Sequence, residues 1–187
     1  MTKYKIDHYF DNHIETINKL KDQKDKIIFI ANTIHNCFKN GGKLYICGNG
    51  GSASDAQHIA AELVGKYLKE KDALPAVSLS TDTSILTAIS NDYGYDQIFK
   101  RQIEAVATEK DIIMVISTSG NSKNIISAIQ AAKEKKSMTI GLLGETNGKA
   151  KDIVDISISV PSNFTPHIQE AHIMIGHIIC QIIDESI

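Results

Sequence analysis

His58 and Glu62 carry side chains that can bind a metal ion or move a proton, and they lie four residues apart. On a helix this spacing places two residues about 40° apart around the axis, so both side chains project from one face. The spacing is typical of helical metal sites, in which imidazole and carboxylate groups suit zinc. It also occurs in surface ion pairs, so the pair alone does not establish a site.

A glycine-rich turn precedes this pair. The turn, Gly48-Asn-Gly-Gly-Ser52, follows a short apolar run at residues 44–47 and leads into a helical pattern at about residues 54–67. Glycines let the backbone approach a ligand, and the unpaired N–H groups of a first helical turn point toward it. We therefore expect this turn to bind an anion such as a phosphate.

A hydroxyl-rich loop repeats this arrangement after another apolar run, residues 112–116. It carries Gly120 and Asn121, which permit a tight turn, and four hydroxyl side chains: Ser117, Thr118, Ser119 and Ser122. Neutral donors and the positive end of a helix dipole suit a sugar phosphate, and no lysine is required. A plain Ser/Thr turn would have the same composition. The presence of two such loops favours a shared phosphate site.

The predicted last helix, about residues 166–184, is apolar around most of its circumference but carries Gln169, His172 and His177. Buried polar side chains cost roughly 1–3 kcal/mol each unless they have partners, so this helix requires a ligand, a metal or a polar network. If it faced the earlier helix, four groups could bind one metal ion: His58, Glu62, Gln169 and His177. Spacing alone cannot show that they meet. The other histidines are interpreted as core or interface residues: His8, His13, His35 and His172.

Apolar runs alternate with helical patterns from residue 43 onward. The expected strands are residues 44–47, 76–80, 112–116, 138–143 and 154–160. The expected helices are residues 54–67, one that follows the cap signal at 81–83 and is broken at 91–95, 98–107, 125–135 and 166–184. This alternation predicts an α/β fold, a three-layer αβα sandwich with a five-stranded parallel sheet of the flavodoxin-like kind. Right-handed crossovers would bring both strand-to-helix loops into one crevice.

The first 40 residues read as a helical arm. Two helices are expected within residues 3–40, separated by a charged break at 21–26. The sheet alone cannot cover such an arm, so it packs either on another subunit or as a cap on its own domain. We expect a single domain over residues 1–187, with the αβα core at about 43–187.

The overall composition excludes several classes of protein. The chain has 187 residues, 42% of them apolar and 22% charged, and a net charge of −2, which is ordinary for a soluble domain. No basic field indicates a nucleic-acid or membrane partner, and no apolar run approaches membrane-spanning length. The three cysteines have no metal-binding or disulfide-framework spacing. We expect a cytoplasmic protein.

Two nucleotide-binding interpretations fit the sequence less well. Gly48-x-Gly50-x-x-Ala53 matches the dinucleotide fingerprint, but the acidic residue expected at the end of the second strand is missing and Asp82 comes late. A dehydrogenase would also leave His58 and Glu62 unexplained. No Gly-Lys-Ser/Thr follows the loop, so there is no Walker A motif.

Six motifs together resemble the phosphoheptose isomerases, single-domain members of the sugar isomerase (SIS) family. They are CGNGGS (47–52), DAQH (55–58), ELVGKY (62–67), NDYG (91–94), ISTSGNS (116–122) and IQEAHIMIGH (168–177). The STSGNS loop alone would indicate only a SIS domain. The His58/Glu62 and Gln169/His177 sets single out the isomerases.

This resemblance implies conversion of D-sedoheptulose 7-phosphate to D-glycero-D-manno-heptose 7-phosphate. That reaction is the first step towards the ADP- or GDP-activated heptoses of bacterial lipopolysaccharide or capsule. It also implies a homotetramer with sites at subunit interfaces and one zinc ion per subunit, held by His58, Glu62, Gln169 and His177. The implied substrate contacts are Asn49, Gly50, Gly51, Ser52, Glu62, Asn91, Asp92, Ser117, Thr118, Ser119, Ser122 and Gln169.

An aldose–ketose isomerase moves one proton between two carbons and another between two oxygens through an enediol(ate). We assign Glu62 as the base at carbon and His177 as the acid–base partner. Lys66 and His167 stand where the family commonly has arginine, which bears on fine substrate contacts. The alternatives are a SIS module that senses a sugar phosphate and an adaptor that binds a replication initiator. An adaptor would survive loss of His58 and Glu62.

Overall fold

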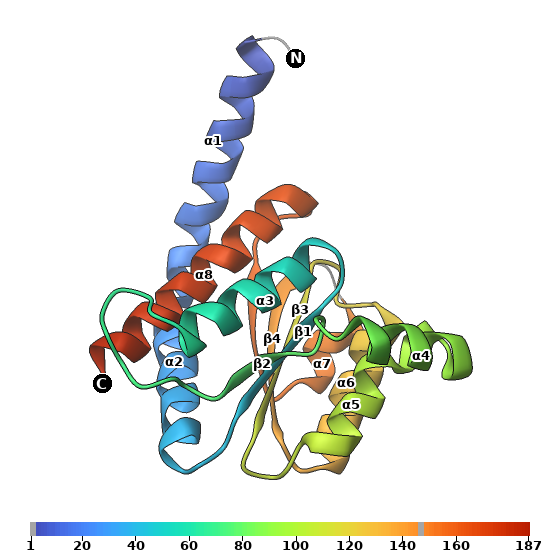
Figure 1. Cartoon of the computed structure of the whole chain (residues 1–187). Helices are drawn as coiled ribbons and strands as arrows, with labels where there is room; N and C mark the ends of the chain where they lie inside the picture. The colour runs from blue at the N-terminus through green and yellow to red at the C-terminus, as the bar shows by residue number, and fades with distance from the viewer. Residues whose placement is uncertain (1–2, 146–147) are drawn as a thin grey trace.

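The computed structural model describes residues 3–145 and 148–187 and is built on one parallel sheet of five strands. Its order is β2-β1-β3-β4-β5, and every neighbouring pair is parallel. The strands are β1 (Leu44–Gly48), β2 (Ala76–Ser78), β3 (Ile112–Ser117), β4 (Met138–Gly144) and β5 (Ile156–Val160). Figure 1 shows helices covering both faces of this sheet, so the predicted αβα sandwich is confirmed.

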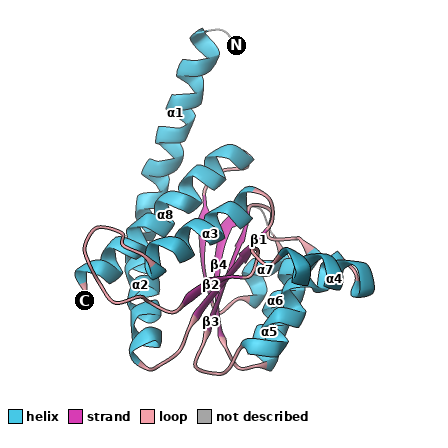
Figure 2. Cartoon of the chain, viewed as in Figure 1, coloured by secondary structure: helices cyan, strands magenta, loops and turns pink. Residues whose placement is uncertain are grey.

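Helices connect the strands and extend the chain at both ends (Figure 2). They are α1 (Lys3–Leu20), α2 (Lys24–Lys39), α3 (Gly51–Val64), α4 (Thr83–Tyr93), α5 (Ile98–Val106), α6 (Lys123–Glu134), α7 (Lys149–Ile153) and α8 (Thr165–Glu185). Two short 3₁₀ turns, η1 (Lys21–Gln23) and η2 (Tyr95–Gln97), lead into α2 and α5. No helix in the described ranges has the length and apolar character that a membrane crossing needs.

The strands bury apolar side chains on both faces, as their continuous apolar runs predict. Leu44 and Ile46 of β1 join the larger core, which α2, α3 and α8 cover. Tyr45 and Cys47 point to the other face and join the core beneath α5 and α6. Both layers of helices are therefore fixed against β1 and β3, the strands that precede the two predicted phosphate loops.

The N-terminal arm divides into two parts. Ile30 and Ile34 of α2 are fully buried in the larger core, so α2 belongs to the sandwich. In α1 only Thr16 and Leu20 are buried. Figure 1 shows α1 projecting away from the sheet beyond the end of α8. The cap interpretation therefore fits α2, whereas most of α1 lies outside its own domain.

Several expected boundaries were wrong. Helix α3 begins at Gly51, three residues before residue 54, because Gly50 turns the chain with a φ of 54°. Helix α4 runs to Tyr93, into the predicted break at 91–95, and Gly94 with a φ of 91° follows it. No helix was predicted between the fourth and fifth strands, where the structure has α7.

The strand order places a crevice at the carboxyl edge of the sheet. The chain leaves β1 toward α3 on one face, and it leaves β3 toward α6 on the other. In a sheet of this order the two connections diverge at β1 and β3, which is where ligands bind in doubly wound folds. The glycine turn and the hydroxyl loop are these two connections.

Candidate active site

The glycine turn and the hydroxyl loop meet around a small polar cavity of about 70 Å³. Its lining comes from the ends of β1 and β3, the starts of α3 and α6, and one side chain of α8. The lining residues are Asn49, Ser52, Ile116, Ser117, Thr118, Ser119, Ser122 and Gln169. The predicted meeting of the two loops in one crevice is therefore observed.

Two consecutive glycines shape the α3 side of this cavity. Gly50 adopts a left-handed conformation that starts the helix abruptly after β1. Gly51 lies against the amide of Gln169, and a β-carbon at Gly51 would overlap that amide. Glycine at this position therefore lets α8 deliver Gln169 to the start of α3.

Asn49 links the two loops through a pair of amide hydrogen bonds. Its Nδ2 donates to Asn124 Oδ1 at 2.9 Å, and Asn124 Nδ2 donates back to Asn49 Oδ1 at 2.8 Å. The hydroxyl of Tyr95 also donates to Asn49 Oδ1, at 3.0 Å. Asn124 and Tyr95 were not predicted as site residues from the sequence. The only available signal was their proximity to the motifs, at the α6 start and in the NDYGY segment.

The hydroxyl loop is held by its own backbone. Ser117 is buried, and its Oγ accepts a hydrogen bond from the Gly120 N–H at 3.1 Å. Ser122 is the N-cap residue of α6 but makes no side-chain capping bond in the described structure, and α3 likewise starts without a side-chain cap. Uncapped helix starts beside a polar cavity leave N–H donors and two dipole ends for an anion.

Helices α3 and α8 run side by side in the same direction. Gly51 contacts Gln169 at their N-terminal ends, and further along a β-carbon at Gly176 would lie 2.7 Å from Ile59 Cδ1. Because Gly176 has no side chain, the helices approach closely at that level. This close packing brings His177 of α8 next to His58 of α3.

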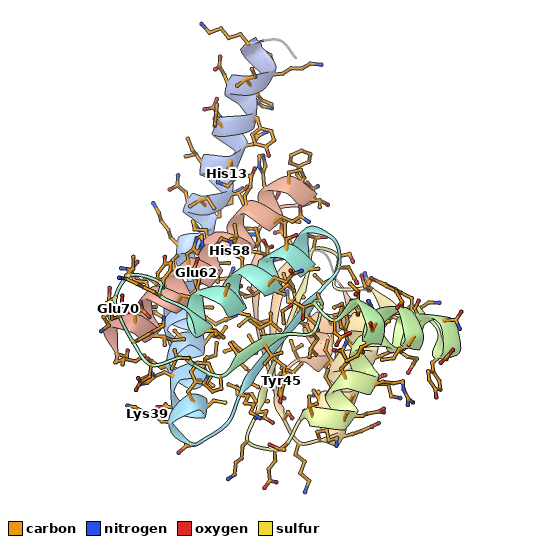
Figure 3. The ribbon with its side chains drawn as sticks, in the orientation of Figure 1. His13, Lys39, Tyr45, His58, Glu62 and Glu70 are labelled. Atoms are coloured by element: carbon orange, nitrogen blue, oxygen red, sulfur yellow. The ribbon has the colours of Figure 1, made fainter. Side chains whose placement is uncertain are left out.

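His58, Glu62 and His177 form one cluster, about two turns along α3 from the polar cavity. Figure 3 labels His58 and Glu62, the two members of the cluster on α3. His58 Nε2 lies 3.0 Å from Glu62 Oε1 and 3.5 Å from His177 Nε2. The ring of Tyr67 stacks on His177 with a centroid separation of 5.9 Å. One donor atom from each of the three residues lies within 4.8 Å of the others. Two imidazoles and a carboxylate so placed fit the ligand chemistry of zinc.

Other predicted site residues lie outside this cluster. Gln169 lines the polar cavity, so its role as a fourth metal ligand stays a prediction. Asn91 and Asp92 occupy the last turn of α4, are exposed, and bond to each other at 2.8 Å. They do not line the described cavity, and their contact with substrate also stays a prediction.

Asp55 is a further titratable group on α3, one turn before His58, and the site prediction did not include it. Partial burial raises its pKa to about 6, although the nearby His58 opposes the shift. Its Oδ2 is buried without a hydrogen-bond partner in the described structure. A carboxyl group of this kind, one turn from His58, is a candidate proton donor or acceptor.

Three positions considered in the sequence analysis have other roles in the structure. Asp82 caps α4 by accepting a hydrogen bond from the Ile85 N–H at 2.9 Å. Its carboxylate therefore has a structural role and does not act as the acidic residue that binds the ribose of a dinucleotide. Lys66 is exposed and pairs with Glu70 at 2.6 Å. His167 is buried beneath α1, away from the cavity lining.

Known proteins are similar to this chain in sequence and in fold. The SIS domain family matches residues 8–144. A phosphoheptose isomerase from a Nitratiruptor species is 53% identical over 175 residues, which cover 93% of this chain and 94% of that protein. The solved phosphoheptose isomerase of Francisella tularensis is 38% identical and covers 99% of this chain and 100% of its own, with a TM-score of 0.94. The solved phosphoheptose isomerase of Neisseria gonorrhoeae is 40% identical and covers 98% of this chain and 98% of its own, with a TM-score of 0.92.

Proposed function

Because this chain belongs to the phosphoheptose isomerase family of SIS-domain proteins, we propose that it converts D-sedoheptulose 7-phosphate to D-glycero-D-manno-heptose 7-phosphate. The observation that carries the proposal is the arrangement along α3 and α8. Their N-terminal ends line a phosphate-sized cavity, and the same two helices carry His58, Glu62 and His177 further along.

The separation between these two places suits this substrate. His58 lies seven positions after Gly51 on α3, a helical rise of about 10 Å. The substrate has its phosphate at one end of a seven-carbon chain and its reacting carbons, C1 and C2, at the other. Binding the phosphate in the cavity would therefore direct C1 and C2 toward the histidine–glutamate cluster.

The chain's own residues supply the proton transfers. Glu62 is the base that removes the proton from carbon and returns it to the neighbouring carbon, through an enediol(ate). His177, which comes from the opposite helix, moves the second proton between the two oxygens. Tyr67 stacks on the His177 ring and restrains its orientation. Asn49, Ser117, Thr118, Ser119 and Ser122 hold the phosphate with neutral donors.

We further propose one zinc ion per subunit at this cluster. His58, Glu62 and His177 would hold it. Gln169 is the proposed fourth ligand, but its amide lies against Gly51, about two helical turns from this cluster, so it would reach the ion only from another subunit. When bound, zinc would polarise the substrate carbonyl and stabilise negative charge on oxygen. A ligand that is fully engaged is a poor proton carrier, so Glu62 and His177 must be loosely held or must change role when substrate binds.

The assembly we propose is a homotetramer with sites at subunit interfaces. Helix α1 supports it, because four large apolar side chains of the projecting helix are exposed: Tyr4, Ile6, Phe10 and Ile14. An apolar groove of about 470 Å³ between α1, α2 and α8 gives further support. Exposed apolar surface of this extent is typical of interfaces between subunits.

The proposed product would enter the synthesis of ADP- or GDP-activated heptoses for lipopolysaccharide or capsule. We place the reaction in the cytoplasm. The three cysteines, Cys37, Cys47 and Cys180, are buried free thiols, as a reducing compartment favours. A sensing module or an adaptor is not favoured, because neither requires the histidine–glutamate cluster.

A turnover assay with sedoheptulose 7-phosphate tests the function and the metal separately. We expect conversion by the purified protein to fall with a chelator and to return when zinc is added back. If the chelator had no effect on turnover, the isomerase function would be supported and the zinc proposal would be contradicted. If the protein bound the substrate but converted none of it in any condition, it would be a sugar-phosphate sensor and not an isomerase.

A further inference from the structure

A second group of metal-binding side chains lies between α1 and α8, outside the site described above. It consists of His13 on the projecting helix and of His167 and Glu170 in the first turns of α8. One donor atom from each lies within 4.8 Å of the others. From the sequence, His13 was interpreted as a core or interface residue, because a single histidine on a helix is more often that than a ligand. More than 150 positions separate it from its two partners.

The contacts converge on one carboxylate oxygen. Glu170 Oε2 lies 2.9 Å from His13 Nδ1 and 3.0 Å from His167 Nδ1. His13 Nδ1 is buried, and its approach to Glu170 is too poorly directed for a hydrogen bond. Two ligands of a tetrahedral zinc ion at about 2.0–2.1 Å lie about 3.3–3.4 Å apart. Each of these two distances would need to lengthen by only a few tenths of an ångström to match that spacing.

The surroundings of this cluster resemble the outer shell of a metal site. The Tyr9 hydroxyl donates to Glu170 Oε1 at 2.6 Å and so fixes the carboxylate, as outer hydrogen bonds do around metal ligands. The rings of Tyr9 and Phe164 pack on His167 with centroid separations of 4.4 and 4.8 Å. Burial raises the pKa of Glu170, but the bonds from Tyr9 and His167 outweigh it and the net shift is downward.

One side of the cluster is open. A cavity of about 420 Å³ lies against Tyr9 and His167, between α1 and the loop that precedes α8. Water could enter from this cavity and complete the coordination of an ion that has three protein ligands. Two imidazole nitrogens and one carboxylate select divalent transition ions of the zinc class over magnesium or calcium, which prefer oxygen ligands.

We propose that His13, His167 and Glu170 form a second zinc-class metal site, which clamps the projecting helix α1 to the start of α8. The ion would tie together two segments that otherwise meet through a few side chains. Because Gln169 lies next to Glu170, the clamp would also steady the turn of α8 that lines the phosphate cavity. This site is independent of the zinc proposed at His58, Glu62 and His177.

Zinc stoichiometry tests the proposal. The full-length protein, stripped of metal, is dialysed to equilibrium against Zn²⁺, and the bound zinc per chain is measured. His13→Ala should remove one zinc ion relative to the wild type. His8→Ala is the matched control, because it removes an exposed histidine of the same helix that lies outside the cluster. Glu170→Gln, which keeps the shape of the side chain, should also lose one ion.

Combination with His58→Ala separates this site from the other. If both sites bind, the wild type holds two ions, each single variant holds one, and the double variant holds none. If the cluster at His58 binds nothing, the wild type holds one ion and His13→Ala holds none, which still supports the second site. A His13→Ala protein that is folded by circular dichroism and binds as much zinc as the wild type would overturn the proposal.

Discussion

At the scale of single residues, the position of Gln169 depends on the absence of a side chain at Gly51. A β-carbon there would overlap the Gln169 amide, whereas a helix start accepts alanine readily. Gly51→Ala should therefore displace Gln169 and lower kcat/KM about 10- to 100-fold, because small misplacements in a site carry costs of that size. Turnover kinetics would measure the loss of activity, and the melting temperature would show whether the helix start accepts alanine.

Ser54→Ala is the control for this prediction. Ser54 is exposed in the same first turns of α3, so its removal should leave both kinetics and stability unchanged. Equal kinetics for Gly51→Ala and the wild type would show that the contact between Gly51 and Gln169 does not matter for the reaction.

His172 predicts how stability depends on pH. Burial lowers its pKa to about 4 from an ordinary value of 6.5. Between pH 4 and pH 6.5 this histidine binds a proton in the unfolded chain but not in the folded chain. Stability from this group is therefore complete above about pH 6.5 and is lost as the pH falls toward 4, by up to about 3 kcal/mol.

His172→Gln should remove this part of the pH dependence. Urea unfolding of both proteins between pH 7 and pH 4 would show a shallower decline in the free energy of unfolding for the variant. Parallel curves for the two proteins would mean that His172 takes up its proton equally in both states.

The sequence identifies side chains that stand out by type and misses those that act through their partners. His58 and Glu62 were found by their spacing on one helix face, and His177 was found because a polar side chain in an apolar helix needs a ligand or a partner. Asn124 and Tyr95 were missed, since their hydrogen bonds to Asn49 depend on the packing of α6 and η2. No spacing rule reports a contact between segments that are tens of residues apart.

At the scale of elements, a buried ion pair fastens the loop after α3 to the end of α8. The side chains of Lys71 and Asp184 are almost completely buried, at 0% and 2% exposed. Lys71 Nζ also donates to the Glu62 carbonyl at 3.0 Å, and Asp184 accepts from the Leu68 N–H at 3.1 Å. The pair therefore holds the C-terminal turn of α3, which carries Glu62.

Lys71→Met should destabilise the protein by about 3–5 kcal/mol, because it leaves the Asp184 carboxylate buried and unpaired. Lys66→Met breaks an exposed lysine–glutamate pair nearby and should cost less than about 1 kcal/mol. Chemical denaturation of both variants measures the difference. Equal losses would mean that Asp184 finds water or another partner when Lys71 is removed.

Element types were predictable and element ends were less so. The alternation of apolar runs and helical patterns correctly predicted five parallel strands with intervening helices. The start of α3 at Gly51 and the extension of α4 to Tyr93 depend on glycine conformations, Gly50 and Gly94, that the residue type permits but does not require. The five residues of α7 are too few to show a helical period.

At the scale of the whole molecule, α1 presents an apolar surface that its own chain does not cover. Phe10 is 61% exposed near the middle of this helix. Phe10→Asp should convert the proposed tetramer to smaller species, because a charge would be buried at the interface. Light scattering coupled to size-exclusion chromatography would measure the mass.

Asn12→Asp adds the same charge to the same helix at a polar position, about 200° from Phe10 around the axis. It should leave the mass unchanged. A wild-type protein that is monomeric at micromolar concentration would contradict the tetramer directly, and a tetrameric Phe10→Asp protein would place the interface elsewhere.

The topology followed from the sequence, but the direction of α1 did not. Strand order and the shared crevice result from general rules for right-handed crossovers, which hold for any chain with this pattern. The projection of α1 depends on the 3₁₀ turn at residues 21–23 and on the protein surface against which the helix packs. The sequence analysis therefore left both the subunit-contact and the cap interpretations open.

The central claim is that Glu62 performs proton transfer at carbon on a heptulose phosphate. The most direct measurement is kcat for sedoheptulose 7-phosphate, followed by NMR, for the wild type, Glu62→Gln and Glu70→Gln. Glu70 is the matched control, an exposed glutamate on the loop after α3 (Figure 3). We expect wild-type turnover in the first and third proteins and a loss of several orders of magnitude in Glu62→Gln, with phosphate binding retained. Near-normal turnover by Glu62→Gln would contradict the assignment of the base.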